Sequence, residues 1–280
     1  MSATVAFEVP SPYGPAAATR TVTLAYARVG VGEPLLLLHG IGHHRQAWDP
    51  VIDILATERE VIAVDLPGFG ASPALPDDFV HDLPTMTAVF GGLCDALELD
   101  RPHVAGNSLG GLLALELGRE KRVRSVTALS PAGFWSRAER RYAFGVLLAM
   151  RRAARSMPVP LVERLSRSAA GRTVLTSTIY ARPGRRSPEA VVAETLALAN
   201  ARRFAETLRN GRDVRFTDDV PDLPVTVAWG TRDMLLVRRQ GIRAKRIIPK
   251  ARLIRLPGCG HVPMNDDPAL VARVILDGSR

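Results

Sequence analysis

Short, continuous apolar runs alternate along this chain with longer segments whose apolar residues recur at helical spacing. Apolar runs of this length are typical of strands that are buried on both faces of a sheet. The pattern predicts strands at 34–38, 61–64, 103–105, 123–129, 225–229 and 252–256. It predicts helices at 48–56, 85–97, 109–119 and 268–276. Strands that alternate with helices at this rhythm indicate a parallel sheet covered by helices on both faces.

Two stretches depart from this alternation. Near the start, 4–9 and 21–28 alternate loosely around Pro12, Gly14 and Pro15, which predicts a β-hairpin. Between 134 and 220 the strands stop, and helical patterns follow one another at 138–154, 160–170, 188–198 and 201–208. A helical block between two strands predicts a cap over the carboxyl edge of the sheet, where open α/β folds bind ligands. We therefore predict a core domain of residues 1–133 and 221–280, with a helical cap (lid) insertion at 134–220.

Composition narrows the class of protein. The 280 residues suffice for one domain, or for one domain with an insertion. Its net charge of +9 comes from Arg, but no basic motif interleaved with aromatics is present, so no nucleic-acid partner is expected. No apolar stretch reaches the roughly 18 residues of a transmembrane segment, and the first ten residues lack an export signal. Two cysteines, Cys94 and Cys259, form no disulfide framework or metal motif and suit a cytoplasmic location.

The predicted cap carries most of the positive charge. Residues 134–215 contain 17 Arg, no Lys and 6 acidic residues. Most of these arginines are expected on solvated helix faces. A cationic cap can also steer an anionic small-molecule substrate toward the sheet, or rest on an anionic membrane surface.

The chemistry of the chain centres on Gly106-Asn107-Ser108-Leu109-Gly110-Gly111. This G-x-S-x-G sequence lies between a predicted strand and a predicted helix, which is the context of a nucleophile elbow. A sharp turn there forces Ser108 into a strained conformation, and the small residues on both sides prevent clashes. The Ser108 hydroxyl then lies at a helix N-terminus, where partial positive charge favours developing negative charge. A strand–helix turn that is merely capped by a serine is the alternative reading.

A nucleophile elbow predicts its partners in the order nucleophile, acid, base. Asp233 follows the strand at 225–229 and is the predicted acid, since residues 130–136 contain no Asp or Glu. His261 follows the strand at 252–256 and is the predicted base. It would take the Ser108 proton through Nε2, while Asp233 would hold Nδ1–H.

The loop after the strand at 34–38 is predicted to complete an oxyanion hole. One donor would be the Leu109 N–H, and the other the Ile41 N–H, with Gly40 letting the backbone turn inward. His39 is expected to orient this loop. Gly40, Asn107 and unidentified cap residues are expected to line the substrate site. His43 and His44 are predicted as solvated loop residues, with a place at the mouth of the pocket as the alternative. His81 and His103 are assigned no role.

These motifs together resemble the α/β-hydrolase fold superfamily. His39-Gly40, the Asp65–Gly70 loop, the elbow, the Gly230–Asp233 turn and the segment from Gly260 to Met264 all match that pattern. The resemblance implies an eight-stranded, mostly parallel sheet and hydrolysis through an acyl-enzyme, with no cofactor and no metal. Dehalogenase and epoxide hydrolase branches carry Asp where this chain has Ser108, so those chemistries are not expected.

With Asn107 directly before the predicted nucleophile, the elbow resembles that of the meta-cleavage product hydrolases, which cut carbon–carbon bonds. Those enzymes usually have Gly-Pro-Gly after the His-Gly pair and Trp after the catalytic His, whereas this chain has Gly42-His43-His44 and Val262. A carboxylic-ester hydrolase is therefore the preferred prediction. C–C bond or thioester hydrolysis on the same triad remains an alternative, as does a ligand receptor that keeps the fold without turnover.

Overall fold

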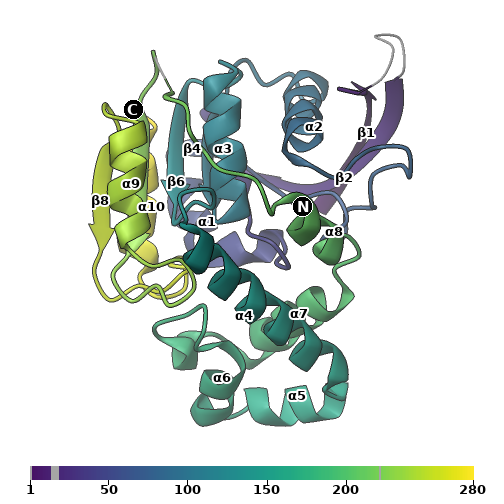
Figure 1. Ribbon diagram of the computed structural model, residues 1–280, viewed down its shortest axis with the longest axis vertical. Coiled ribbons are helices and arrows are strands. Elements are labelled where there is room, and N and C mark those ends of the chain that lie inside the picture. The colour runs from purple at the N-terminus through teal and green to yellow at the C-terminus, as the bar shows by residue number, and fades with distance from the viewer. Residues whose placement is uncertain (1, 14–18, 221) are drawn as a thin grey trace.

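In the computed structural model, which describes residues 2–13, 19–220 and 222–280, eight strands form one sheet (Figure 1). Their order across the sheet is β1-β2-β4-β3-β5-β6-β7-β8. β1 pairs antiparallel with β2, β2 pairs antiparallel with β4, and all the other pairs are parallel. The strands are β1 (Ser2–Pro10), β2 (Thr19–Val29), β3 (Glu33–Leu38), β4 (Arg59–Val64), β5 (His103–Asn107), β6 (Ser125–Leu129), β7 (Val225–Gly230) and β8 (Arg252–Leu256).

This sheet confirms the predicted fold class. The predicted hairpin is the β1–β2 pair, although Gly14 and Pro15 of its turn lie outside the described residues.

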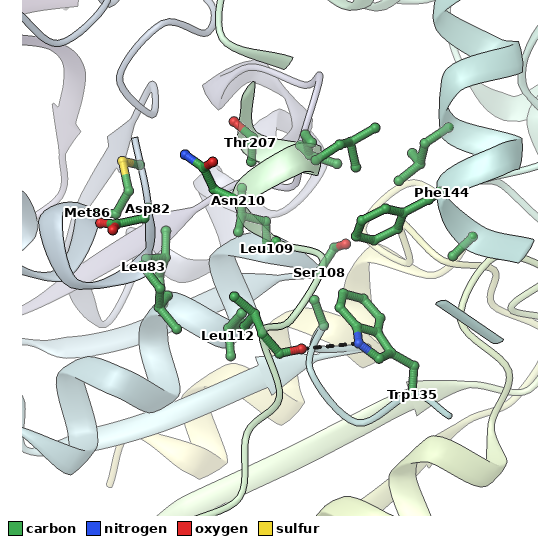
Figure 2. A pocket seen from close by; sticks show the side chains of 18 of the residues that line it. Asp82, Leu83, Met86, Ser108, Leu109, Leu112, Trp135, Phe144, Thr207 and Asn210 are labelled. Carbon is green, nitrogen blue, oxygen red and sulfur yellow. Dashed lines mark hydrogen bonds between the residues drawn. The ribbon is translucent and has the colours of Figure 1, made fainter. Parts of the chain in front are cut away.

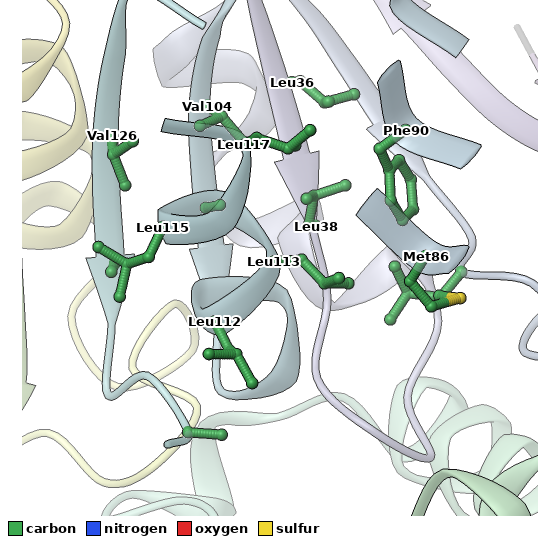
Figure 3. Packing of buried hydrophobic residues seen from close by; sticks show 14 of the residues in the cluster. Leu36, Leu38, Met86, Phe90, Val104, Leu112, Leu113, Leu115, Leu117 and Val126 are labelled. Atoms are coloured by element: carbon green, nitrogen blue, oxygen red, sulfur yellow. The ribbon is translucent and has the colours of Figure 1, made fainter. Parts of the chain in front are cut away.

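Helices cover both faces of the sheet, as the continuous apolar runs predict. Leu35 and Leu37 of β3 pack in one buried cluster with α1 (Asp49–Leu55) and α10 (Pro268–Gly278). Leu36 and Leu38 point to the opposite face, toward α2 (Leu83–Ala96) and α3 (Leu109–Arg119). Figure 3 shows this second cluster, with leucines of α3 in front of the strands and Phe90 of α2 to their right. Alternate residues of each central strand thus enter two separate cores.

Among the described residues, five α-helices separate β6 from β7, and we call the segment that they span, residues 137–210, the helical insertion. They lie together at the lower end of the molecule in Figure 1, with α8 nearer the sheet. Four of them pack on one another, with α4, α5 and α6 all in contact with α7. The helices are α4 (Arg137–Ser156), α5 (Val159–Ser166), α6 (Ala169–Thr176), α7 (Pro188–Asn200) and α8 (Phe204–Asn210). A short 3₁₀ helix at Pro183–Arg185 precedes α7, and another at Arg45–Trp48 precedes α1.

Three local predictions were wrong. The single helix expected at 160–170 is two helices, because the Ser168 side chain accepts the Gly171 N–H at 3.0 Å and starts α6 there. α8 begins at Phe204 rather than Ala201, since the Ala201 carbonyl and the Arg202 N–H bind Arg151 and Gly68 instead. The third is an omission, α9 (Arg239–Ile247).

The apolar stripe of α9 is too thin to be recognised in the sequence. Only Gln240, Gly241 and Ala244 of this helix are buried. A Cβ at Gly241 would lie 3.1 Å from the Trp229 ring, so the helix packs closely on β7 without a large apolar side chain.

Candidate active site

Ser108 occupies a strained turn between β5 and α3. Its φ of 56° and ψ of −113° lie outside the regions that non-glycine residues favour, a conformation that costs on the order of 1–3 kcal/mol. The turn is tight enough to require glycine on both sides. A Cβ at Gly106 would lie 2.1 Å from the Gly110 carbonyl oxygen, and one at Gly110 would lie 2.1 Å from the Leu38 carbonyl oxygen.

The backbone around Ser108 is fixed by hydrogen bonds to β6 and the loop that follows it. Ser108 N–H donates to the Leu129 carbonyl at 3.0 Å, and the Ser108 carbonyl accepts from Ala132 N–H at 3.0 Å. Leu109 is the first residue of α3. The N–H groups of a first helical turn have no acceptor within the helix, so this end carries partial positive charge beside the Ser108 side chain.

His261 and Asp233 are hydrogen bonded to each other, from loops that follow β8 and β7. His261 Nδ1 lies 2.9 Å from Asp233 Oδ2, and both side chains are buried. Asp233 Oδ1 accepts the N–H groups of Leu235 and Leu236 at 2.9 and 2.8 Å. A carboxylate only accepts hydrogen bonds, so His261 donates Nδ1–H and its Nε2 is left as the acceptor.

Asn107 connects the elbow to the His261 loop. Its side-chain Nδ2 donates to the His261 carbonyl at 2.9 Å and to the Leu129 carbonyl at 3.1 Å. Asn107 also lines a pocket together with Ser108 and His261. Both amide hydrogens are committed to the backbone, so only the Oδ1 of Asn107 is left to meet a ligand.

The loop from His39 to His43 holds one peptide bond beside Ser108. The Gly40 carbonyl accepts His43 N–H at 3.2 Å and the Nδ1–H of His39 at 2.7 Å. His39 Nε2 accepts the Leu66 N–H at 3.0 Å, which fixes the proton on Nδ1. In a trans peptide the N–H points opposite to the carbonyl, so Ile41 N–H faces away from these donors. A Cβ at Gly40 would lie 3.2 Å from the Ser108 Cβ, which shows how near this peptide passes.

Burial lowers the pKa of His39 to about 4, so this imidazole is neutral at physiological pH. Its two hydrogen bonds orient the loop, and the ring is fully buried.

The other carboxylates near the elbow are engaged elsewhere. Asp65 accepts the Arg45 N–H at 2.6 Å and the Ala71 N–H at 2.9 Å, and pairs with the Arg45 guanidinium. Asp267 caps α10 by accepting the Leu270 N–H. Asp266 accepts N–H groups from Gly260, Ala181 and Arg182, and so ties the His261 loop to the helical insertion.

Two pockets meet at Ser108 and share its side chain, Ile41, Leu147 and Leu235. The first, the Trp135 pocket, has mainly apolar walls that include Met86, Leu112, Trp135 and Phe144. Figure 2 shows Ser108 beside Phe144 and Trp135, with Asp82, Leu83 and Met86 grouped on the far side. The second, the His261 pocket, is lined by His261, Val262, His43 and Glu194. The structure thus brings Ser108 and His261 to one cavity, with helices of the insertion in both walls.

A sequence model of the alpha/beta hydrolase family matches residues 35–274 of the chain. The chain belongs to this family. A thermophilic esterase from Thermogutta terrifontis has a similar structure, with a TM-score of 0.74 and 22% identity, covering 98% of this chain and 97% of that one. At this identity the likeness shows a shared fold.

Curated relatives are similar in sequence. An uncharacterized protein of Mycobacterium tuberculosis is 28% identical over 263 residues, which are 88% of this chain and 74% of the relative. The 2-hydroxy-6-oxo-2,4-heptadienoate hydrolase of Pseudomonas putida is 37% identical over 110 residues, which are 38% of this chain and 40% of that enzyme.

The sequence did not reveal a buried polar network in the wall of the His261 pocket. Arg186 Nε and Tyr180 OH donate to Glu194 Oε1 at 2.6 and 3.0 Å. The guanidinium of Arg186 also donates to the Gln46 carbonyl at 3.2 Å, which links the insertion to the core. Glu194 Oε2 is buried and has no hydrogen-bond partner among the described residues. Burial raises the pKa of Glu194, and the Arg186 guanidinium opposes that shift.

The prediction that His43 and His44 are solvated was wrong. Both are only 8% exposed, and their rings stack with centroids 5.3 Å apart. The His44 N–H donates to His43 Nδ1, and His43 Nε2 lies 3.4 Å from Tyr180 OH. The helical insertion covers this loop, and no pattern within residues 39–44 could have indicated that.

The part of the chain that the structure describes contains neither a metal-binding cluster nor a membrane-spanning helix. Among the described residues, no group of three or more His, Cys, Asp and Glu side chains is placed to hold a metal ion. None of the helices in the described part of the chain combines the length and apolar character that a bilayer span requires.

Proposed function

We propose that this protein is a serine hydrolase that cleaves carboxylic esters through an acyl-enzyme, with Ser108, His261 and Asp233 as its catalytic triad. The observation that carries the proposal is the strained Ser108 turn at the junction of two pockets, one of which also contains the hydrogen-bonded His261. The domain division proposed for the chain, a core of 1–133 and 221–280 with a cap of 134–220, accounts for the pocket walls that the helical insertion supplies.

In the first half of the reaction, Ser108 Oγ attacks the ester carbonyl carbon while His261 Nε2 takes the hydroxyl proton. The carbonyl oxygen becomes an oxyanion that accepts the N–H groups of Ile41 and Leu109. The carbon–oxygen bond to the alcohol then breaks, and His261 gives its proton to the leaving alkoxide. Asp233 stabilises the imidazolium between these two transfers.

Water completes the cycle. His261 removes a proton from a water molecule as it attacks the acyl-enzyme, and the same two N–H groups stabilise the second oxyanion. Collapse breaks the bond to Ser108 Oγ, which recovers its proton from His261, and releases the carboxylic acid. The strain at Ser108 keeps its Oγ exposed to the pockets throughout.

The two pockets would divide the substrate between them. The leaving alcohol must receive a proton from His261, and His261 lines the His261 pocket but not the Trp135 pocket. We therefore assign the alcohol to the His261 pocket and the acyl chain to the Trp135 pocket. The apolar walls of the Trp135 pocket suit a hydrocarbon acyl chain. Gly40 and Asn107, which line the His261 pocket, would contact the alcohol side.

C–C bond hydrolysis is the second candidate on the same triad. It is favoured by the 37% identity over 110 residues to the heptadienoate hydrolase of Pseudomonas putida. Thioester hydrolysis is a variant of the ester reaction, and a receptor that binds a ligand without turnover is the alternative from another class. The two free, buried cysteines support the cytoplasmic location.

A substrate panel tests the proposal. Aryl esters, acyl thioesters and 2-hydroxy-6-oxodienoic acids are compared by kcat/KM in the wild-type protein, with Ser108→Ala as the control. The proposal expects esters to be the best class, and expects Ser108→Ala to fall below about a tenth of wild-type kcat. Higher kcat/KM for the dienoic acids would move the function to C–C hydrolysis. Turnover that survives Ser108→Ala would remove Ser108 as the nucleophile.

A further inference from the structure

His81 is a buried imidazole that the proposed mechanism does not use. It is 2% exposed and lines the Trp135 pocket. Neither ring nitrogen has a hydrogen-bond partner within the described residues. Its backbone is held, because the His81 carbonyl accepts the Asn210 Nδ2 at 2.9 Å.

Such a side chain opposes folding unless something offsets it. An imidazole that loses its water without gaining a partner costs free energy, because its buried nitrogens give up hydrogen bonds to solvent. Phe69 approaches the His81 ring with centroids 6.4 Å apart, and this ring contact leaves both nitrogens without a hydrogen bond. A histidine that lines a pocket with both nitrogens unpartnered is explained if a ligand supplies the partners.

The place of His81 in the Trp135 pocket indicates which part of a ligand it would meet. It precedes Asp82 directly, and Asp82, Leu83 and Met86 lie on the opposite side of the pocket from Trp135 and Phe144, beside which Ser108 stands (Figure 2). An acyl chain bound to Ser108 would run along the apolar walls and end near this side.

We propose that His81 is a specificity-determining residue that binds a hydroxyl group at the distal end of the substrate's acyl chain. The inference rests on the proposed function, since it takes Ser108 as the nucleophile and the Trp135 pocket as the acyl site. It adds a substrate class, the esters of hydroxyacyl chains.

A neutral hydroxyl fits His81 better than a carboxylate does. Burial lowers the pKa of His81 to about 4, so the ring is neutral and offers one N–H donor and one nitrogen acceptor. A hydroxyl group can donate one hydrogen bond and can also accept one. It can therefore pair with either nitrogen of the His81 ring, and can at the same time bond to a second polar group. Among the described residues that line the pocket none is Arg or Lys, so an anionic end would lack a countercharge.

The charged groups nearest to His81 already have partners. The Asp82 carboxylate accepts from Tyr13 OH at 2.6 Å and from the Thr85 N–H at 3.1 Å. Arg203 pairs with Asp77 and with Glu206. Among the described residues that line the pocket, the two ring nitrogens of His81 are therefore the buried side-chain polar atoms without a partner; Thr85 Oγ1, which also has none, lies outside the lining.

The test compares matched p-nitrophenyl esters, hexanoyl against 6-hydroxyhexanoyl and octanoyl against 8-hydroxyoctanoyl. Wild-type protein is expected to prefer the hydroxyl-bearing ester of at least one pair by kcat/KM. His81→Phe is expected to reduce that preference by at least about tenfold, since a site built to bond a hydroxyl discriminates strongly. His81→Gln, which keeps a donor and an acceptor, is expected to retain part of it. Met150→Leu, in the wall of the His261 pocket only, is the matched control and is expected to leave the preference unchanged.

An unchanged preference in His81→Phe, or a wild-type preference for the plain chain in every pair, would overturn the inference while leaving ester hydrolysis intact. If no ester is turned over, the proposed function fails, and ligand binding tests His81 by itself. Thermal shifts with 8-hydroxyoctanoic acid and octanoic acid are then compared. A larger shift for the hydroxy acid that disappears in His81→Phe supports the subsite, and equal shifts in both proteins contradict it.

Discussion

Asp233 holds His261 through one carboxylate oxygen and is itself held through the other. Oδ2 lies 2.9 Å from His261 Nδ1, while Oδ1 accepts two backbone N–H groups from Leu235 and Leu236. The carboxylate is therefore oriented by the turn after β7, whether or not His261 is protonated. A side chain held this way can stabilise the same imidazole tautomer throughout a reaction.

Asp233→Asn is expected to lower kcat by on the order of 10⁴ without unfolding the protein. The amide can keep Oδ1 on the Leu235 and Leu236 N–H groups, but it then presents its NH₂ to His261 Nδ1 and favours the wrong tautomer. Steady-state kinetics measures the loss, and circular dichroism confirms the fold. Asp65→Asn and Asp267→Asn are the matched controls, expected to affect stability more than chemistry. A mild Asp233→Asn with a crippling control variant would show that the acid is misassigned.

The buried pair of Arg186 and Glu194 is expected to stabilise the contact between the helical insertion and the core. Arg186→Met leaves the Glu194 carboxylate buried without its cation, and removal of one partner from such a pair costs about 3–5 kcal/mol. A second substitution, Glu194→Leu, is expected to restore most of the loss. Chemical denaturation measures the free energy of unfolding, with Arg152→Met on the exposed face of α4 as the control. Equal stability of the single and double variants would contradict this account.

Acid is expected to destabilise the protein between about pH 6.5 and pH 4. Burial lowers the pKa of His39 and of His81 to about 4, and the pKa of His43 well below its usual value. In that window the unfolded chain binds more protons than the folded one, so stability falls as the pH falls. Each such histidine contributes up to about 1.4 kcal/mol per pH unit. Urea denaturation at pH 7 and pH 5 measures the drop. His81→Phe is expected to show a smaller drop, and an equal one would contradict the assignment.

The arginines of the helical insertion lead to a prediction about salt. Seven of the arginines between 137 and 185 are exposed. Among the described residues, no Arg or Lys lines either pocket. The arginines can therefore act on a substrate only from a distance. For an anionic ester, kcat/KM is expected to fall as ionic strength rises, because the screening length shortens. For a neutral analogue it is expected to stay flat. Equal responses for the two esters would mean that the arginines do not steer substrate.

Much of the core could be predicted because its signals are local. The elbow needs only Gly106, Ser108 and Gly110 between a strand and a helix, and steric contact explains each glycine. Asp233 and His261 each follow a strand, and the carboxyl ends of neighbouring parallel strands meet at one sheet edge. The chain order of motifs therefore carried the geometry of the proposed triad.

The walls of the pockets could not be predicted, since their contacts join distant segments. Arg186 reaches the Gln46 carbonyl across 140 positions, and Asn210 reaches the His81 carbonyl across 129. His43 and His81 carry no local pattern that distinguishes a buried ring from a solvated one. Their roles depend on how the helical insertion packs over the sheet, and no motif in the insertion fixes that packing.

The central claim, that Ser108 is an activated nucleophile, is tested most directly with a fluorophosphonate probe and mass spectrometry of the intact and digested protein. Attack by Ser108 Oγ on phosphorus would expel fluoride and leave a stable phosphonyl ester. The account predicts one adduct per chain, located on Ser108, absent in Ser108→Ala, with ester turnover lost in proportion to labelling. Native protein that stays unlabelled, or an adduct elsewhere with turnover intact, would contradict it.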